Sequence, residues 1–283
     1  MKLLMLKLLM IITLLSTNLF ADKKIDDDIL QYEKKKIASI LKRQNIELNN
    51  VSIVLKKDLQ QNGWYGYVFN LTFTVNGKQL NQKDTLFTNG KLISPELINI
   101  KTKQSFKDIL YPTLTKKFFN KENLIAGNPN AKHSLVVFSD PLCPICVDEI
   151  PTIIKNIRNN PNNIALYYYS LPLQMHPTAQ TLAKASMIAK NMGIKNVEYT
   201  LYNTNFGTLY DAYKVKDDQV ALDHFNKVFK TNITTDQIND NKLDERLQKE
   251  IKFSEEAFVN GTPTLFFDGE IDRTRSKYEK YLK

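Results

Sequence analysis

The amino-acid sequence predicts a two-domain protein in which a small α+β domain precedes a larger α/β domain with a helical insertion. In the first domain, one helical pattern is followed by residues whose hydrophobicity alternates with the period of a β-strand. In the second, a strand–helix–strand pattern is followed by a long helical stretch, a final strand and a final helix. The chain of 283 residues is long enough to bury two separate cores.

Residues 1–21 have the pattern of a secretory signal peptide. Lys2 and Lys7 give a positive first segment, residues 8–20 are apolar, and Ala21 offers a small residue for cleavage. The apolar run is too short for a typical spanning helix, although an uncleaved N-terminal membrane anchor is the alternative. Either way, we expect the rest of the chain in the periplasm, an oxidising compartment where cysteine pairs make and exchange disulfides.

The charge of the chain does not indicate a nucleic-acid-binding protein. The formal net charge is +9 at pH 7, but most cations are lysines scattered among asparagines and acids, as in residues 33–36. No arginine-rich cluster is interleaved with aromatic side chains, so we expect no nucleic-acid partner. The basic surface is expected to be solvated.

Residues 22–104 are predicted to form the small α+β domain. Apolar residues at helical spacing form one face of an opening helix: Ile25, Ile29, Ile37, Ile40 and Leu41. The period then changes to two, most clearly at Tyr65, Tyr67, Phe69, Leu71, Phe73 and Val75. Asn76-Gly77 and Asn89-Gly90 are hairpin turn signals, because both residue types accept positive φ. This domain has neither cysteine nor histidine, so we interpret it as structural, with sheet edges that self-association would cover.

Residues 105–122 are predicted to connect the two domains. Their apolar residues suit one face of a linker helix: Phe106, Ile109, Leu110, Leu114, Phe118 and Phe119. Pro112 must start, kink or interrupt that helix. A linker helix would hold the domains apart at a fixed angle, while the same pattern also fits a surface helix packed on either domain.

Residues 123–283 are predicted to form the α/β domain. An apolar strand ends at Ser139, and a helix opens at the cysteines that follow. The next strand is apolar on both faces, which indicates a central position in a sheet. The elements expected after the first helix are a strand over residues 164–171, helices over residues 178–192 and 243–258, a strand over residues 264–267 and a last helix through Tyr278 and Leu282.

The only two cysteines of the chain form the motif Cys143-Pro144-Ile145-Cys146 at a strand-to-helix junction. A helix N-terminus offers free N–H groups and partial positive charge, which stabilise a thiolate at Cys143. Cys146, one turn into the helix, is expected to be shielded and to resolve the mixed disulfide that Cys143 forms. Pro144 suits the first helical turn, where its missing N–H costs nothing. The pair is therefore predicted to be catalytic in thiol–disulfide exchange.

Metal binding and haem attachment are the alternatives for two cysteines at this spacing. A zinc site needs two more ligands, and the histidines of the chain are scattered: His133, His176 and His224. Covalent haem attachment requires a histidine directly after the second cysteine, and that residue is Val147. We therefore expect neither a metal nor a cofactor.

Neighbouring residues are expected to tune the thiolate. The dipeptide between the cysteines, Pro144-Ile145, sets its immediate environment. Asp140 and Glu149, if they lie close to the sulfur, would oppose thiolate formation because like charges repel.

Thr262-Pro263 precedes a short apolar strand in the last part of the chain. Proline is tolerated in a paired strand mainly at its first residue, and we predict a cis bond between these two residues. A cis bond would bring the backbone of Thr262 beside the sulfurs, where it can pair with an extended substrate chain. Thr262 and Pro263 are therefore predicted to bind substrate.

The motif from Phe138 to Cys146, together with Thr262-Pro263 downstream of a helical insertion, resembles the periplasmic thiol–disulfide oxidoreductases of the thioredoxin fold. Asp-Pro ahead of Cys-Pro-x-Cys particularly resembles the DsbC and DsbG family. The motif resemblance covers residues 123–283, whereas for residues 22–104 it rests on position and layout alone. It implies a thioredoxin-fold catalytic domain and a cystatin-like dimerisation domain, joined in a V-shaped homodimer.

The resemblance leaves three functions open. The first is a dimeric isomerase or reductase that acts on unfolded or misoxidised periplasmic proteins and is kept reduced by a DsbD-like membrane partner. The second is a dimeric oxidase kept oxidised by a DsbB-like partner, although Pro-Ile lacks the histidine of strongly oxidising DsbA-type sites. The third is a periplasmic chaperone in which the cysteines are secondary. The resting redox state of the cysteines separates the first two, and anti-aggregation activity without cysteines would support the third.

Overall fold

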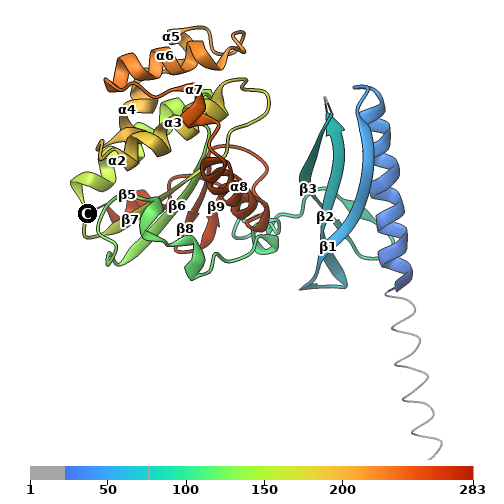
Figure 1. Ribbon diagram of the computed structural model, residues 1–283. Coiled ribbons are helices and arrows are strands. Elements are labelled where there is room, and N and C mark those ends of the chain that lie inside the picture. Colours follow the sequence, from blue (N-terminus) through green and yellow to red (C-terminus); the bar gives the residue numbers. More distant parts are fainter. Residues whose placement is uncertain (1–22, 76, 283) are drawn as a thin grey trace, which may run out of the picture. The chain divides into compact units, whose positions relative to one another are not determined.

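The computed structural model describes residues 23–75 and 77–282, which form two compact units, one ending at Leu110 and the other beginning at Tyr111 (Figure 1). The predicted signal peptide, residues 1–21, lies outside the described residues. Within the described ranges, no helix is both long and apolar enough to cross a membrane.

The first unit consists of one helix packed on a four-stranded antiparallel sheet, and this confirms the predicted helix and hairpins. The described part of the helix covers residues 23–42. The strands are β1 (Glu47–Gln61), β2 (Trp64–Val75), β3 (Lys78–Thr88) and β4 (Ile93–Ser94), and they neighbour one another in that order. The predicted alternation in β2 is the reason for the packing, because its apolar face meets the helix. The core of this unit is Ile29, Ile37, Val51, Tyr67, Phe69, Leu71 and Leu86.

Each connection between these strands contains an Asn-Gly pair in the sequence. Asn62 and Gly63 join β1 to β2, and both have positive φ, at 47° and 77°. Asparagine and glycine adopt this conformation at low cost, which allows a two-residue hairpin turn. Gly77 and Gly90, in the two predicted turns, also have positive φ, at 75° and 80°. The turn at Asn62-Gly63 was not among the predicted turns.

The prediction of a linker helix over residues 105–122 was wrong. This stretch contains three short 3-10 turns: η1 (Asp108–Leu110), η2 (Lys116–Phe118) and η3 (Lys121–Asn123). Pro112 cannot donate a helical hydrogen bond and disfavours helical backbone in the residue before it. After it, Leu114 donates its N–H to the carbonyl of Gly269 at 2.9 Å. Apolar side chains that suggested a helix face, such as Phe118, instead pack in the core of the second unit.

The second unit is built on a five-stranded mixed sheet. Its strands are β5 (Leu124–Ala126), β6 (His133–Ser139), β7 (Ile164–Ser170), β8 (Thr264–Phe267) and β9 (Glu270–Asp272). They neighbour one another in the order β5-β7-β6-β8-β9. β6 is parallel to β7 on one side and antiparallel to β8 on the other, so it lies at the centre of the sheet. Its residues Leu135 to Phe138 are completely buried.

Helices cover both faces of this sheet. They are α2 (Pro144–Asn159), α3 (Ala179–Asn191), α4 (Val197–Thr204), α5 (Phe206–Leu209), α6 (Asp218–Phe229), α7 (Thr235–Ile238) and α8 (Asn241–Glu256). Isoleucines of α2 pack on one face, and Phe253 of α8 joins the cluster on the other. The insertion has a core of its own, formed by residues from α3 to α7. The predicted helices over residues 178–192 and 243–258 correspond to α3 and α8.

The shortest elements of this unit were not predicted correctly. β5 and β9 have three residues each, too few to show an alternating pattern. The predicted last helix is the 3-10 helix η4 (Lys277–Tyr281), in which Tyr278 is buried in the same cluster as α2.

Candidate active site

The two cysteines lie where the central strand β6 turns into α2. Cys143 is the residue before the first helical turn, with extended backbone angles (φ −68°, ψ 121°), and Pro144 begins the helix. Ile145, between the cysteines, is 46% exposed. Cys143 is 6% exposed, whereas Cys146 is completely buried. Both are free thiols in this structure.

The surroundings of Cys143 stabilise a thiolate. They lower the pKa of its thiol to about 5, chiefly because the Cys146 thiol donates a hydrogen bond to it. The Thr262 side chain and the backbone N–H groups of Ile145 and Cys146 act in the same direction, while burial opposes them. Cys143 is therefore ionised at neutral pH.

The surroundings of Cys146 have the opposite effect. Burial raises the pKa of this thiol far above its ordinary value, and the neighbouring Cys143 raises it further. A hydrogen bond with the Ser139 side chain and one with the backbone of Asp140 counteract this in part. At neutral pH one sulfur is thus a nucleophile and the other is a protonated, enclosed thiol.

The bond between Thr262 and Pro263 is cis, as predicted. The following strand, β8, pairs with β6, and Thr264 lies opposite Phe138 in that pairing. This register brings Thr262 to the cysteines across 119 positions of sequence. When it is protonated, the Cys143 thiol donates a hydrogen bond to the backbone carbonyl of Thr262, with 3.3 Å between Sγ and O.

The hydroxyl of Thr262 can donate a hydrogen bond to a charged sulfur at Cys143. Its Oγ1 atom is buried and has no hydrogen-bond partner among the described residues. A thiolate at Cys143 supplies the missing acceptor, which is why the Thr262 side chain lowers the pKa of that thiol. Ionisation of Cys143 therefore satisfies a group that is otherwise left without a partner.

We predict that Thr262→Val raises the pKa of Cys143 by about one unit, because it removes one hydrogen bond to a charged group while preserving side-chain shape. The pH dependence of the alkylation rate of Cys143 measures this shift. Thr264→Val is the matched control, since the Thr264 hydroxyl donates to the carbonyl of Gly261 at 2.7 Å. An unchanged midpoint in Thr262→Val would contradict the interpretation.

Asp140 is completely buried and forms hydrogen bonds with two loops. Its carboxylate accepts the backbone N–H groups of Leu142, at 2.7 Å, and Leu173, at 2.6 Å. The same carboxylate hydrogen-bonds Nδ1 of His176 at 2.8 Å. These hydrogen bonds hold the segment that carries Cys143 to the segment after β7. Because Asp140 hydrogen-bonds His176, any effect of the Asp140 charge on the Cys143 sulfur is combined with an effect of the His176 imidazole.

His176 is a residue that the sequence analysis did not assign to the active site. It is buried, and the hydrogen bond with Asp140 raises the pKa of its imidazole, with a further contribution from the Cys143 charge. Its ring meets Tyr213 edge-on at 5.9 Å, and the Tyr213 hydroxyl donates to the carbonyl of Leu142 at 3.0 Å. No spacing in the sequence signals this arrangement, because His176 reaches Cys143 only through the packing of two loops.

Glu149, the second acid expected near the sulfur, is partly neutralised. It forms an ion pair with Arg275 at 3.0 Å. Partial burial raises the pKa of its carboxyl, and the Cys143 charge contributes to the same shift. Among the described residues, no three or more histidine, cysteine, aspartate or glutamate side chains are grouped as a metal site.

The sequence profile of the thioredoxin family matches residues 120–283, which is more than half of the chain and includes the whole site. The chain belongs to the thioredoxin family. No curated protein matches it. The family assignment agrees with the observed α/β sheet and with the cysteine pair at the head of the first long helix of this unit.

Several solved structures are similar to this thioredoxin-family chain at low identity. A thioredoxin-like oxidoreductase from Silicibacter pomeroyi DSS-3 is 16% identical, with 56% of this chain and 88% of the other covered and a TM-score of 0.46. DsbA2 from Pseudomonas aeruginosa is 20% identical, with coverages of 54% and 89% and a TM-score of 0.40. ScsC from Proteus mirabilis is 18% identical, with coverages of 59% and 74% and a TM-score of 0.44.

Proposed function

We propose that this protein catalyses thiol–disulfide exchange on secreted proteins in the periplasm, as a dimeric disulfide isomerase or reductase of the DsbC and DsbG type. The observation that carries the proposal is the contrast between its two sulfurs. Cys143 has a pKa of about 5, and Cys146 is a completely buried thiol. Only Cys143 is thus ready to attack a substrate disulfide at neutral pH, and Cys146 stays protonated.

The exchange proceeds in two steps. The Cys143 thiolate attacks a substrate disulfide, forms a mixed disulfide and displaces one substrate thiolate. Cys146 then loses its proton and attacks Cys143, which releases the second substrate thiolate and leaves a disulfide between the two cysteines. When a substrate thiolate attacks the mixed disulfide before Cys146 does, the substrate rearranges its own disulfides and the enzyme stays reduced.

The backbone around Thr262 supports docking of an extended substrate. Its carbonyl faces Cys143, and Ile145 is exposed between the two cysteines. An extended chain that pairs with backbone beside Thr262 and Pro263 would present its own sulfur to Cys143. Unfolded or misoxidised proteins, in which such chain segments are accessible, are therefore the proposed substrates.

The first unit is proposed to join two copies of the chain. Its β1 and β4 are edge strands, and edge strands invite pairing with another chain. It also exposes large apolar side chains after β3: Leu92 (63%), Ile98 (60%) and Ile100 (80%). A second copy would cover such a surface in a symmetric dimer, as expected for a cystatin-like dimerisation domain.

A chain that begins at Tyr111 tests this assignment. We expect it to be monomeric and to reduce a small disulfide substrate at nearly the full rate, because the cysteines and their contacts lie in the second unit. Isomerisation of a scrambled multi-disulfide protein should fall about tenfold or more, since two sites in one particle act at high effective concentration. Light scattering gives the mass, and full-length protein is the control. A dimeric truncated chain would contradict the assigned interface.

Periplasmic location and a membrane redox partner complete the proposal. The signal-peptide pattern of residues 1–21 supports export. An isomerase needs its cysteines kept reduced in an oxidising compartment, so a DsbD-like reductant is the proposed partner.

A dimeric DsbA-like oxidase is the second candidate, because the Cys143 pKa of about 5 favours it. A stabilised thiolate stabilises the reduced form and makes the disulfide more oxidising. The Pro144-Ile145 dipeptide, which lacks a histidine, and the nearby acids Asp140 and Glu149 favour a weaker oxidant instead. The resting redox state of the two cysteines in the native periplasm distinguishes the candidates, with reduced cysteines supporting the isomerase and oxidised cysteines supporting the oxidase.

A further inference from the structure

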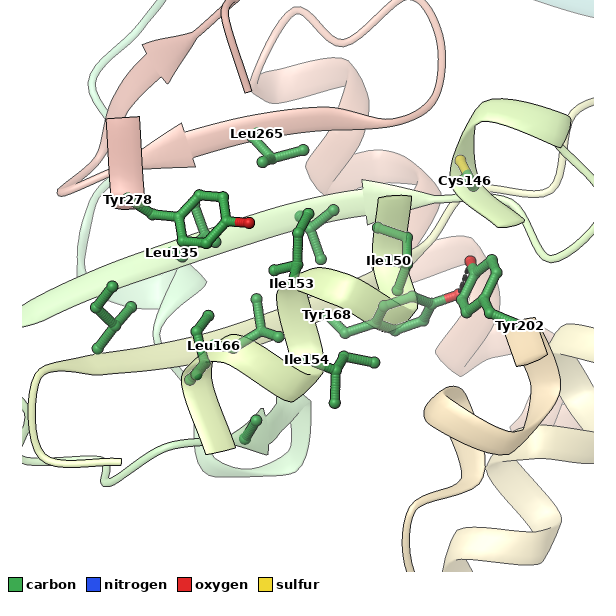
Figure 2. Packing of buried hydrophobic residues seen from close by; sticks show 14 of the residues in the cluster. Leu135, Cys146, Ile150, Ile153, Ile154, Leu166, Tyr168, Tyr202, Leu265 and Tyr278 are labelled. Atoms are coloured by element: carbon green, nitrogen blue, oxygen red, sulfur yellow. Dashed lines mark hydrogen bonds between the residues drawn. The ribbon is translucent and has the colours of Figure 1, made fainter. Parts of the chain in front are cut away.

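A row of buried hydroxyl groups leads to Cys146 from the interior of the second unit. Ser139 is the last residue of β6, Tyr168 lies in β7, and Tyr202 lies in α4. Figure 2 shows the two tyrosines with their hydroxyls facing one another within the same cluster as Cys146. Ser139 is 0% exposed, Tyr202 1% and Tyr168 4%, so water does not solvate these groups freely.

The hydrogen bonds of the row have a direction. Tyr202 donates to Oγ of Ser139 at 2.6 Å, which leaves the hydrogen of Ser139 free to point elsewhere. The Ser139 side chain acts in turn on Cys146, whose thiol pKa it lowers. The hydroxyl oxygens of Tyr168 and Tyr202 lie 2.9 Å apart. Because Tyr202 gives its own hydrogen to Ser139, Tyr168 is the donor in this pair. Burial raises the pKa of both tyrosines well above its ordinary value, which keeps them protonated.

The burial of three hydroxyl groups in an apolar core requires an explanation. A buried hydroxyl costs free energy unless it is hydrogen-bonded, and phenylalanine would fill the same space. The three hydroxyl groups hydrogen-bond one another, and the row ends at Cys146, the buried group whose charge changes during exchange. A hydrogen bond aimed at that charge has its largest effect in surroundings without water.

We propose that Ser139 is a catalytic residue that donates a hydrogen bond to the Cys146 thiolate, and that Tyr202 and Tyr168 are positioning residues that orient Ser139. This inference rests on the proposed exchange reaction and concerns its second half. The backbone contact from Asp140 to Cys146 adds to the same stabilisation.

The assisted step is balanced as follows. The Cys146 thiol gives its proton to solvent, and its sulfur attacks Cys143 of the mixed disulfide. The bond between Cys143 and the substrate sulfur breaks, its electron pair leaves with the substrate thiolate, and the Cys143–Cys146 disulfide forms. In reverse, a substrate thiolate attacks Cys143 and the electron pair of the broken disulfide returns to Cys146. Both directions pass through negative charge on Cys146, so one hydrogen bond assists both.

A nitrobenzoate disulfide that releases a coloured thiolate separates the two halves of the reaction in the full-length chain. The first release reports attack by Cys143, and the second reports attack by Cys146 on the mixed disulfide. The variants are Ser139→Ala, which removes the donor to sulfur, and Tyr202→Phe, which removes the group that orients it. Tyr169→Phe is the matched control, because Tyr169 is equally buried on β7 but donates to the carbonyl of Phe118 at 2.9 Å.

We expect Ser139→Ala to slow the second release about tenfold, as for loss of a hydrogen bond to a charged group, and Tyr202→Phe to slow it about threefold. The first release should stay within about twofold of the original rate in both variants. Tyr169→Phe should leave both releases unchanged. A merely structural role of the row would slow both releases together or lower the unfolding temperature alone.

Either of two outcomes overturns the inference: a second release at the original rate in both Ser139→Ala and Tyr202→Phe, or equal slowing in Tyr169→Phe. If Tyr202→Phe fails to fold, Ser139→Ala decides alone, since it removes one oxygen atom from the core. An original chain that releases only one coloured thiolate, with no disulfide formed, would overturn the exchange reaction and this inference together. Two releases from the original chain with no effect of the variants would overturn the hydroxyl row alone.

Discussion

We expect Cys143→Ser to abolish thiol–disulfide exchange, and Cys146→Ser to leave a chain that accumulates mixed disulfides with its substrates. The first variant removes the thiolate that the helix N-terminus, Cys146 and Thr262 stabilise. The second keeps a nucleophile but removes the sulfur that resolves the intermediate. Electrophoresis without reductant, after exposure to an unfolded disulfide-bonded protein, should show covalent adducts for Cys146→Ser and none for Cys143→Ser.

The alkylation rates of the two thiols in the original chain are a second test of these roles, because the Cys146 thiol donates the main hydrogen bond to Cys143. The alkylation rate of Cys143 in the original reduced chain should rise as pH passes upward through about 5 and be level at neutral pH, because the thiolate is the reacting form. Cys146 should stay unreactive there, since burial raises its pKa. Equal alkylation rates of the two thiols at neutral pH would contradict the assigned roles.

The cysteine pair was predictable from sequence because its chemistry is local. A strand pattern that ends at Ser139 and a helix that opens at Pro144 are visible in the order of residues, and the helix start supplies the field that Cys143 needs. Thr262-Pro263 was predicted from its place before a short apolar strand, taken together with the cysteine pair. Its distance from the cysteines along the chain carries no signal of contact.

The remaining parts of the site depend on tertiary packing. His176 faces Asp140 because a loop after β7 packs beside the loop before α2, and Tyr202 reaches Ser139 from a short helix of the insertion. Single tyrosines and histidines have no period that marks such contacts. The stretch of residues 105–122 was misread for a related reason, since Leu114 and Phe118 serve the core of the second unit instead of one face of a helix.

Asp140→Asn should cause the largest loss of stability among single substitutions of a polar residue at the site. The carboxylate is completely buried and accepts two backbone N–H groups as well as His176. An amide keeps one acceptor oxygen and turns its NH₂ group toward a donor, so at least one buried N–H loses its partner. We expect the free energy of unfolding to fall by about 3 kcal/mol at pH 6, as for a broken buried ion pair, measured by urea denaturation.

Asp268→Asn is the control, because it changes the same kind of group at the surface. Asp268 pairs with Nδ1 of His133 at 2.8 Å and accepts the N–H of Ser134 at 2.9 Å, yet its side chain is 44% exposed. Exposed pairs contribute little, so we expect a loss below about 1 kcal/mol. Equal losses in the two variants would mean that burial of the carboxylate does not govern its contribution.

The loss in Asp140→Asn should also depend on pH, with a sign fixed by His176. The hydrogen bond with Asp140 raises the pKa of His176 in the folded state. Its contribution to stability is therefore complete below the unfolded value of about 6.5 and disappears as pH rises through the raised folded value. The difference in unfolding free energy between the original chain and Asp140→Asn should accordingly be larger at pH 6 than at pH 9. A difference that stays constant over this range would mean that the Asp140–His176 contact is a neutral hydrogen bond, and that the positive charge beside Cys143 is absent.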